Sequence, residues 1–228
     1  MRRFLFISTI LIAPLLAACD KDEATPEEPD ATTGASIPSH EDDNGNTAGD
    51  GKTLIFFFSR AGENWQVGVV EKGNTAIMAE YIQEFTKADV FEIVPEVAYP
   101  EGYEDCKTVA TSEKNSNARP KFKGSIENLS QYENVFIGSP IWWGEPPMIM
   151  HTFYEAYPEL KEKTIIPFGT HGGSGVGSCL TTLKKYYPDA NYLESLGISG
   201  SEIRSESSKT TVKNWAHPQS SGYDYPKI

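Results

Sequence analysis

From residue 51 onward, short apolar runs alternate with amphipathic segments. The run at 53–59 (TLIFFFS) is continuously apolar, which is typical of a central parallel strand that is buried on both faces. The segment at 74–85 instead has helical periodicity, with apolar residues spaced three and four apart. Its predicted buried stripe consists of Ile77, Met78, Tyr81, Ile82 and Phe85.

The same alternation continues to the end of the domain. Further strands are predicted at 89–95, 134–140, 163–171 and 191–199. Further helices are predicted at 103–115, 148–157 and 176–187, and a last one within 205–216. Charged residues and a closing proline in 89–95 favour an edge strand. Five strands with right-handed helical crossovers predict an α/β fold with a doubly wound parallel sheet, occupying 51–228.

The first 18 residues have the features of a targeting segment. Arg2 and Arg3 precede an apolar stretch that is short for a membrane span, and Leu16, Ala17 and Ala18 lead directly to Cys19. Small residues followed by cysteine resemble a bacterial lipoprotein cleavage box, which implies lipidation at Cys19 and a membrane-anchored protein of the cell envelope. The alternative is an ordinary signal peptide followed by a chance cysteine.

Residues 19–50 predict a lipidated cysteine and a disordered acidic tether. The stretch 20–50 has almost no large apolar residue, and its ten acidic residues and one lysine give a net charge of −9. The domain that follows is only moderately acidic and has no basic tract, so nucleic-acid binding is not expected. Three cysteines are too few for a disulfide framework, and we expect Cys106 and Cys179 to be free and buried.

Ligands of open α/β sheets bind beyond the carboxyl ends of the strands. After the first strand, Ser59 and Arg60 precede a Gly73-Asn74-Thr75 sequence at a helix start. The unpaired N–H groups of a helix start attract phosphate, and an arginine adds a charge-assisted contact. The alternative is plain capping of the helix by Asn74 or Thr75.

After the third strand, the chain reads Ser139-Pro140-Ile141-Trp142-Trp143-Gly144. Two adjacent tryptophans at a sheet edge predict a flat apolar surface for a planar heteroaromatic ligand. We expect one indole to pack against the protein and the other to contact the ligand.

After the fourth strand, residues 170–178 (THGGSGVGS) contain four glycines between 172 and 177. Their exposed backbone N–H groups can bind the polar edge of a ring, whereas the alternative is a flexible connector. Taken together, the three loops predict a phosphate site, a stacking surface and a polar ring edge, which is the shape of a flavin mononucleotide, FMN.

The combination of SRAGEN and GNT, SPIWWG and THGGSG resembles the flavodoxin family. The resemblance implies a flavodoxin-like sheet of order 2-1-3-4-5 in a three-layer α/β/α fold with FMN as the cofactor. It assigns the phosphate to Ser59, Arg60, Asn74, Thr75 and Ala76. It assigns the ribityl chain and the ring to Pro140, Ile141, Trp142, Trp143 and Gly144. It assigns the polar edge of the ring to Thr170, His171, Gly172, Gly173, Ser174 and Gly175. An insertion at 60–72 separates the two halves of the phosphate loop.

The resemblance implies electron transfer to a redox partner or reduction of a small planar acceptor such as a quinone. The loop after the fourth strand contains no aromatic residue, which predicts an open ring face where such an acceptor could stack. The alternative is that Tyr99, Tyr103 or the inserted Trp65 covers this face. His171 is a candidate for proton transfer or for a purely structural hydrogen bond. His151 is expected to be structural, and no metal-ligand spacing is present.

The sequence also bears on two other functional classes. A serine hydrolase is disfavoured, because the G-x-S-x-G pattern fails at Ser174, which is followed two residues later by Val176. A flavin-free interaction domain on the same fold, kept as an envelope lipoprotein, is the alternative to an FMN-binding protein.

Overall fold

The computed structural model describes residues 52–220, with side chains to Ala216. The predicted signal peptide (1–18), the tether (19–50) and the lipidation site at Cys19 lie outside the described residues. Within the described part, no helix combines the length and apolarity that a membrane crossing requires.

The core of the fold is a parallel sheet in the order β10-β8-β7-β1-β4. Its strands are β1 (Lys52–Phe57), β4 (Asp89–Glu92), β7 (Tyr132–Pro140), β8 (Thr164–His171) and β10 (Leu196–Ser199), and the short β9 (Asn191–Tyr192) also pairs with β8. In sequence order this is the predicted 2-1-3-4-5 arrangement, which is therefore confirmed. All these strands are parallel, but β4 is added on one side of β1 and β7 on the other. The order of strand addition therefore reverses at β1, and such a switch point is where open α/β sheets bind ligands.

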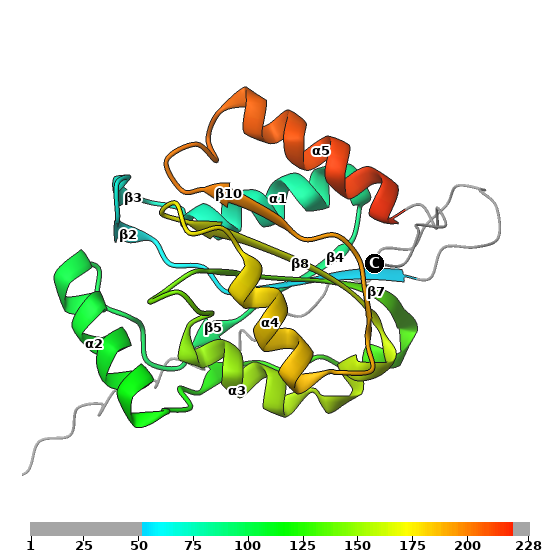
Figure 1. The fold of residues 1–228 in the computed structure, drawn as a ribbon, viewed down its shortest axis with the longest axis horizontal. Coiled ribbons are helices and arrows are strands. Elements are labelled where there is room, and N and C mark those ends of the chain that lie inside the picture. Colours follow the sequence, from blue (N-terminus) through cyan, green and yellow to red (C-terminus); the bar gives the residue numbers. More distant parts are fainter. Residues whose placement is uncertain (1–51, 221–228) are drawn as a thin grey trace, which may run out of the picture. The chain divides into compact units, whose positions relative to one another are not determined.

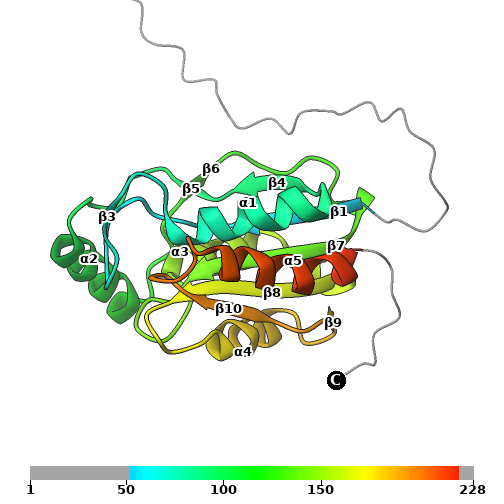
Figure 2. The ribbon, with the colours of Figure 1, turned by 90° about the horizontal axis from the view of Figure 1, so that it is seen from above.

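Helices cover both faces of this sheet (Figures 1 and 2). Helices α1 (Asn74–Thr86) and α5 (Glu206–Ser220) lie on one face, and α3 (Met148–Ala156) and α4 (Gly177–Tyr186) lie on the other. Alternation along β1 explains the two cores, since Ile55 and Phe57 pack towards α1 and α5 while Leu54 and Phe56 pack towards α3. The domain is thus a three-layer α/β/α fold, as predicted.

Two predicted strands are interrupted. The segment at 89–95 leaves the sheet after β4, and β5 (Val94–Pro95) pairs antiparallel with β6 (Phe122–Lys123) instead. The segment at 191–199 pairs with β8 at its two ends, as β9 and β10, and is irregular between them. Both breaks occur at the sheet edges, where a strand has a neighbour on one side only and pairing is least constrained.

The insertion forms a small hairpin of β2 (Gly62–Asn64) and β3 (Gly68–Val70). It stands at the carboxyl end of the sheet, next to α2 (Tyr103–Ser116), and α2 lies at this end rather than flat on a sheet face (Figures 1 and 2). Two short 3₁₀ helices, η1 (Leu129–Gln131) and η2 (Pro158–Glu162), precede β7 and β8. The hairpin and α2 therefore enclose the sheet edge at which the sequence places its candidate residues.

Candidate functional site

A cavity of about 270 Å³ lies at the carboxyl ends of β1, β7 and β8. All three candidate loops contribute to its wall, and every predicted binding residue except Ala76, Gly173 and Gly175 lines it. The predicted residues on the wall are Ser59, Arg60, Asn74, Thr75, Pro140, Ile141, Trp142, Trp143, Gly144, Thr170, His171, Gly172 and Ser174. Residues up to 115 positions apart in the chain are thus brought to one cavity by the parallel register of the sheet.

One end of the cavity is the start of α1. The residue preceding the helix, Gly73, is extended and offers no side-chain cap, so the alternative of capping by Asn74 or Thr75 is wrong. Instead, the Ala76 N–H donates to Ser59 Oγ over 3.0 Å, which explains why Ala76 does not reach the cavity wall. A side chain at position 73 would meet Ser59, since a Cβ there would lie 2.3 Å from Ser59 Oγ.

Two buried hydroxyl groups join this helix start to β8. Thr75 Oγ1 and Thr170 Oγ1 lie 2.8 Å apart, and both residues line the cavity although almost none of their surface is exposed. A buried hydroxyl needs a partner, so this pair holds the loops after β1 and β8 in one arrangement.

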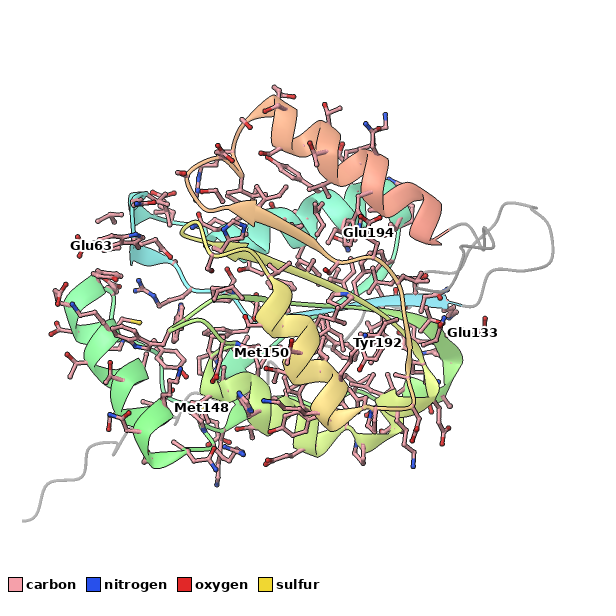
Figure 3. The ribbon with its side chains drawn as sticks, viewed as in Figure 1. Glu63, Glu133, Met148, Met150, Tyr192 and Glu194 are labelled. Atoms are coloured by element: carbon pink, nitrogen blue, oxygen red, sulfur yellow. The ribbon has the colours of Figure 1, made fainter. Side chains whose placement is uncertain are left out.

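Arg60 also has a structural role that was not predicted. Its guanidinium donates to the backbone carbonyls of Pro100 (2.8 Å), Glu101 (3.0 Å) and Glu63. Glu63 N donates to the Glu101 carbonyl (2.8 Å), and the Glu63 carboxylate accepts the N–H of Tyr103 at the start of α2 (3.0 Å). Figure 3 labels Glu63 on the hairpin. Arg60 lines the cavity, but its bonds attach the hairpin to the segment before α2, so it braces the wall.

The adjacent tryptophans Trp142 and Trp143 have different surroundings: the first packs against the protein and the second is exposed at the cavity. Trp142 is partly buried and packs edge-on against Phe58 and Tyr99, with ring centroids 5.6 and 5.1 Å away, on the outside of the core on the α3 side. Trp143 is 53% exposed although it lines the cavity. One indole is therefore structural, and the other offers its surface to the cavity.

Trp143 and Gly144 form a tight turn between Trp142 and Glu145. The Trp142 N–H donates to the Glu145 carbonyl (2.8 Å), and the Glu145 N–H donates back to the Trp142 carbonyl (3.1 Å). Both central residues have positive φ, 53° at Trp143 and 76° at Gly144, as a type I′ turn requires. Lys114 of α2 donates to the Trp143 carbonyl over 2.9 Å, which fixes this strained turn.

The third loop is ordered by His171. The Gly173 N–H donates to His171 Nδ1 (3.0 Å), which turns Gly173 away from the cavity wall, and Gly175 (φ 72°) lies within the turn that follows. Partial burial lowers the pKa of His171, against the opposing effects of a backbone hydrogen bond at Gly197 and the charge of Glu202. The ring is therefore mainly neutral near pH 7, and its Nδ1 accepts a loop hydrogen bond.

The hairpin and α2 add further residues to the wall, including Trp65 and Tyr103, two of the aromatic residues that the sequence offered as possible covers for the ring. The hairpin contributes Trp65, which is 58% exposed, lies 5.5 Å from the Tyr103 ring and approaches Gly172 so closely that a Cβ there would be 2.9 Å from the indole. The β8 loop itself contains no aromatic residue, as predicted, but Trp65 reaches it from the insertion, and Trp65 is one of the residues named in the alternative to an open ring face. The helix α2 supplies Tyr103, Cys106, Lys107 and Ala110, and Asn64 and Gly200 complete the wall. The four α2 residues have i, i+3, i+4, i+7 spacing, which places them on one face of the predicted helix and could have indicated that this face lines a site.

The two cysteines and His151 have structural surroundings and not those of reactive groups. Cys106 and Cys179 are free and buried, as predicted, and burial raises the pKa of the Cys179 thiol to about 11. Although Cys106 lines the cavity, burial raises its pKa, so it is a thiol rather than a thiolate. His151 lies off the cavity, with its Nδ1 2.9 Å from the Tyr186 hydroxyl. Among the described residues, no group of three or more potential metal ligands gathers.

A doubly wound parallel sheet with a cavity at its switch point is the arrangement in which open α/β proteins bind their ligands. The flavodoxin family model matches residues 67–218, and the chain belongs to the flavodoxin family. None of the curated proteins matches the chain.

Solved structures extend this comparison. A candidate flavoprotein from Bacteroides eggerthii is 32% identical, with 74% of this chain and 97% of that chain covered and a TM-score of 0.58. A candidate flavoprotein from Bacteroides uniformis is 28% identical, with coverage of 73% and 98% and the same TM-score of 0.58. A flavoprotein from Lactobacillus acidophilus, solved in complex with FMN, is 21% identical, with coverage of 64% and 92% and a TM-score of 0.51.

Proposed function

We propose that this protein binds FMN in the cavity and serves in electron transfer or in the reduction of a small planar acceptor such as a quinone. The observation that carries the proposal is the convergence of three loops on one cavity with a helix start at one end and an exposed indole at another. Membership of the flavodoxin family and the FMN complex of the Lactobacillus acidophilus protein support the choice of flavin.

The start of α1 suits a phosphate group. Ser59, Thr75 and Thr170 bring hydroxyl groups to this part of the wall, and the first turn of the helix brings backbone N–H groups. Asn74 is 9% exposed and adds a side-chain amide. Hydrogen-bond donors together with the positive end of the helix dipole favour a dianion here.

The middle of the cavity suits a flat ring. Trp143 presents exposed indole from the β7 loop, and Trp65 presents exposed indole from the hairpin. A large aromatic surface left partly in solvent is stabilised when a planar ligand covers it, by about 2–3 kcal/mol if half of one indole is covered. The glycines after β8 leave backbone next to Trp65 without intervening side chains. FMN therefore fits the wall at both its charged and its aromatic end.

When bound, FMN supplies the electron-accepting and electron-donating chemistry. The residues of this chain would bind and shield it: the loop at Ser59 and Thr75 would hold the phosphate, and Trp143 would cover ring surface. Trp65 limits stacking of a second molecule on the side of the β8 loop, because it already lies against Gly172. An acceptor reaches the ring edge directly, or stacks on the ring after Trp65 moves. His171 orders the β8 loop beside the site, and in the catalytic role proposed for it, one ring nitrogen would have to leave its backbone partner at Gly173 or Gly197 before it could carry a proton to a bound ligand.

We also propose that the domain works at the bacterial cell envelope, held to the membrane by a lipid on Cys19. The cleavage-box resemblance at Leu16 to Cys19 supports this, as does the acidic, proline-rich stretch that separates Cys19 from the domain. Incorporation of labelled fatty acid into the wild-type protein, and its loss in Cys19→Ser, tests the anchor. Equal incorporation in both would reject it.

The experiment that tests the cofactor is a visible spectrum of the purified protein, followed by titration with FMN. A yellow protein, or a colourless one that takes up one FMN per chain, is expected. A colourless protein that FMN does not reconstitute would favour the flavin-free interaction domain. Mixing the FMN-loaded protein with NADPH and a quinone then separates the two functions, since turnover indicates a reductase and its absence with every pair favours a carrier.

A further inference from the structure

Arg204 lies beside the start of α1 although it comes from the far end of the chain. It sits between β10 and α5, directly after Ile203, which is completely buried in the core on the α1 and α5 side. The Ile203 N–H donates to the Ser199 carbonyl (3.0 Å), and the Gly200 N–H donates to the His171 carbonyl (2.9 Å). The buried Ile203 side chain and these backbone hydrogen bonds fix the backbone position of Arg204.

The guanidinium of Arg204 contacts the turn before α1 at two places. Its Nη1 donates to Asn74 Oδ1 over 2.6 Å, and its Nη2 donates to the Lys72 carbonyl over 2.8 Å. These acceptors flank Gly73, the residue that precedes the helix. Arg204 thus bridges the backbone before the helix and the side chain of its first residue.

This contact decides which way the Asn74 amide faces. A guanidinium has donors only, so it must meet the amide oxygen and not the amide nitrogen. Asn74 lines the cavity and is buried beside Gly200, where a Cβ would lie 2.5 Å from Nδ2. With Oδ1 held by Arg204, the NH₂ group is the part of Asn74 that is left for the cavity. A donor at this position attracts an anion, whereas the amide oxygen would repel one.

We infer that Arg204 is a positioning residue that makes this site selective for the phosphorylated flavin, FMN, over riboflavin. It acts through Asn74 by presenting the amide NH₂ to the phosphate, and it adds a positive charge next to the helix start. Arg204 does not itself line the cavity, so it acts through Asn74, whereas Arg60 lines the cavity and donates to three backbone carbonyls of the hairpin and the segment before α2. The inference rests on the proposed binding of FMN.

The test compares dissociation constants for FMN and for riboflavin, which share the ring but differ in the phosphate. We expect Arg204→Gln to weaken FMN binding about tenfold or more and riboflavin binding less than about threefold, as for loss of a charge-assisted contact. Arg204→Lys should be intermediate, because an ammonium group lacks the planar fork that spans both acceptors. Asn74→Asp should lower FMN affinity further, since it keeps the acceptor for Arg204 and turns a second oxygen towards the cavity.

The matched control is Arg119→Gln, which removes the same charge from an arginine that pairs with Glu155 and does not line the cavity. Its ratio of riboflavin to FMN dissociation constants should equal that of the wild type. An unchanged ratio in Arg204→Gln, or an equal fall in Arg119→Gln, would overturn the inference while leaving FMN binding intact. A wild-type protein that binds neither flavin would remove the proposed function and this inference with it. If Arg204→Gln unfolds, the ratios of Arg204→Lys and Asn74→Asp decide in the same way.

Discussion

The two ends of the cavity are built on opposite principles. At the start of α1, Thr75 and Thr170 are buried and bonded to each other, and Ser59 and Asn74 each have a partner from another segment. At the other end, Trp65 and Trp143 leave more than half of their surface exposed. The first end is fixed by satisfied polar contacts before a ligand arrives, whereas the second keeps apolar surface that only a ligand would cover. The residues at the start of α1 therefore fix the shape of the site, whereas the two exposed indoles are the residues whose burial by a ligand would contribute most to binding.

The largest expected contrast is between Trp142 and Trp143, whose removal should affect stability and FMN binding in opposite proportions. Trp142→Ala should lower the free energy of unfolding by about 3 kcal/mol, because its indole packs against Phe58 and Tyr99. Trp143→Ala should hardly change the stability of the flavin-free protein, yet weaken FMN binding roughly 30-fold, equivalent to about 2 kcal/mol. Urea unfolding and FMN titration of both variants measure the crossed pattern. Equal losses of stability would show that the two indoles are not divided in this way.

A matched pair of glycines compares the rigidity of the two ends. Gly73→Ala should cost about 2 kcal/mol and reduce FMN binding, because its Cβ would lie 2.3 Å from Ser59 Oγ and 2.5 Å from the Arg60 carbonyl. Gly172→Ala should cost less than about 1 kcal/mol, since the exposed Trp65 indole can shift away. Gly177→Ala, which meets nothing within 4 Å, is the control for both. Thermal unfolding with and without FMN reports the order, and a larger effect at Gly172 would reverse the comparison.

The threonine pair tests whether the α1 end is held together by its hydroxyl groups. Thr75→Val should lower stability by about 1–2 kcal/mol, because Thr170 Oγ1 is left buried without a partner. Thr170→Val should do the same, and the double variant should cost less than the sum of the two. A double-mutant cycle of unfolding free energies measures this coupling. Additive losses would mean that the two hydroxyls do not depend on each other.

The smallest expected effect is a dependence of stability on pH through His171. Burial lowers its folded pKa below the ordinary value near 6.5, so the unfolded chain binds the proton more readily. The contribution of neutral His171 is present above pH 6.5 and is lost as the pH falls below it, by less than about 1 kcal/mol. The measurement is the wild-type stability curve minus that of His171→Gln between pH 7 and 5. A difference that grows as the pH falls would contradict the lowered pKa.

The sequence predicted the parts of the site that depend on local pattern. Ser59, Trp143 and Thr170 follow apolar runs that are easily recognised as strands, and parallel strands bring their carboxyl ends to one edge. The strand order came with the family resemblance. The edge strands were predicted as continuous because their apolar residues extend beyond the segments that pair.

Contacts between distant segments were not predictable in the same way. Arg204 and Asn74 are 130 residues apart, and no periodicity links them. Arg60 has the residue type of a phosphate ligand, but its fork is occupied by backbone carbonyls that only the folded chain brings near. Trp65 belongs to an insertion whose hairpin covers the cavity because Arg60 and Glu63 attach it to the start of α2. Such roles depend on where a side chain's partners lie in the folded structure.

The most direct test of the central claim is a calorimetric titration of the purified, flavin-free protein with FMN, repeated in the Trp143→Ala variant. The account predicts one FMN per chain for the wild type and a clearly weaker affinity, with the same stoichiometry, for the variant. No heat of binding and no flavin absorbance on the wild-type protein, or an affinity that Trp143→Ala leaves unchanged, would contradict it.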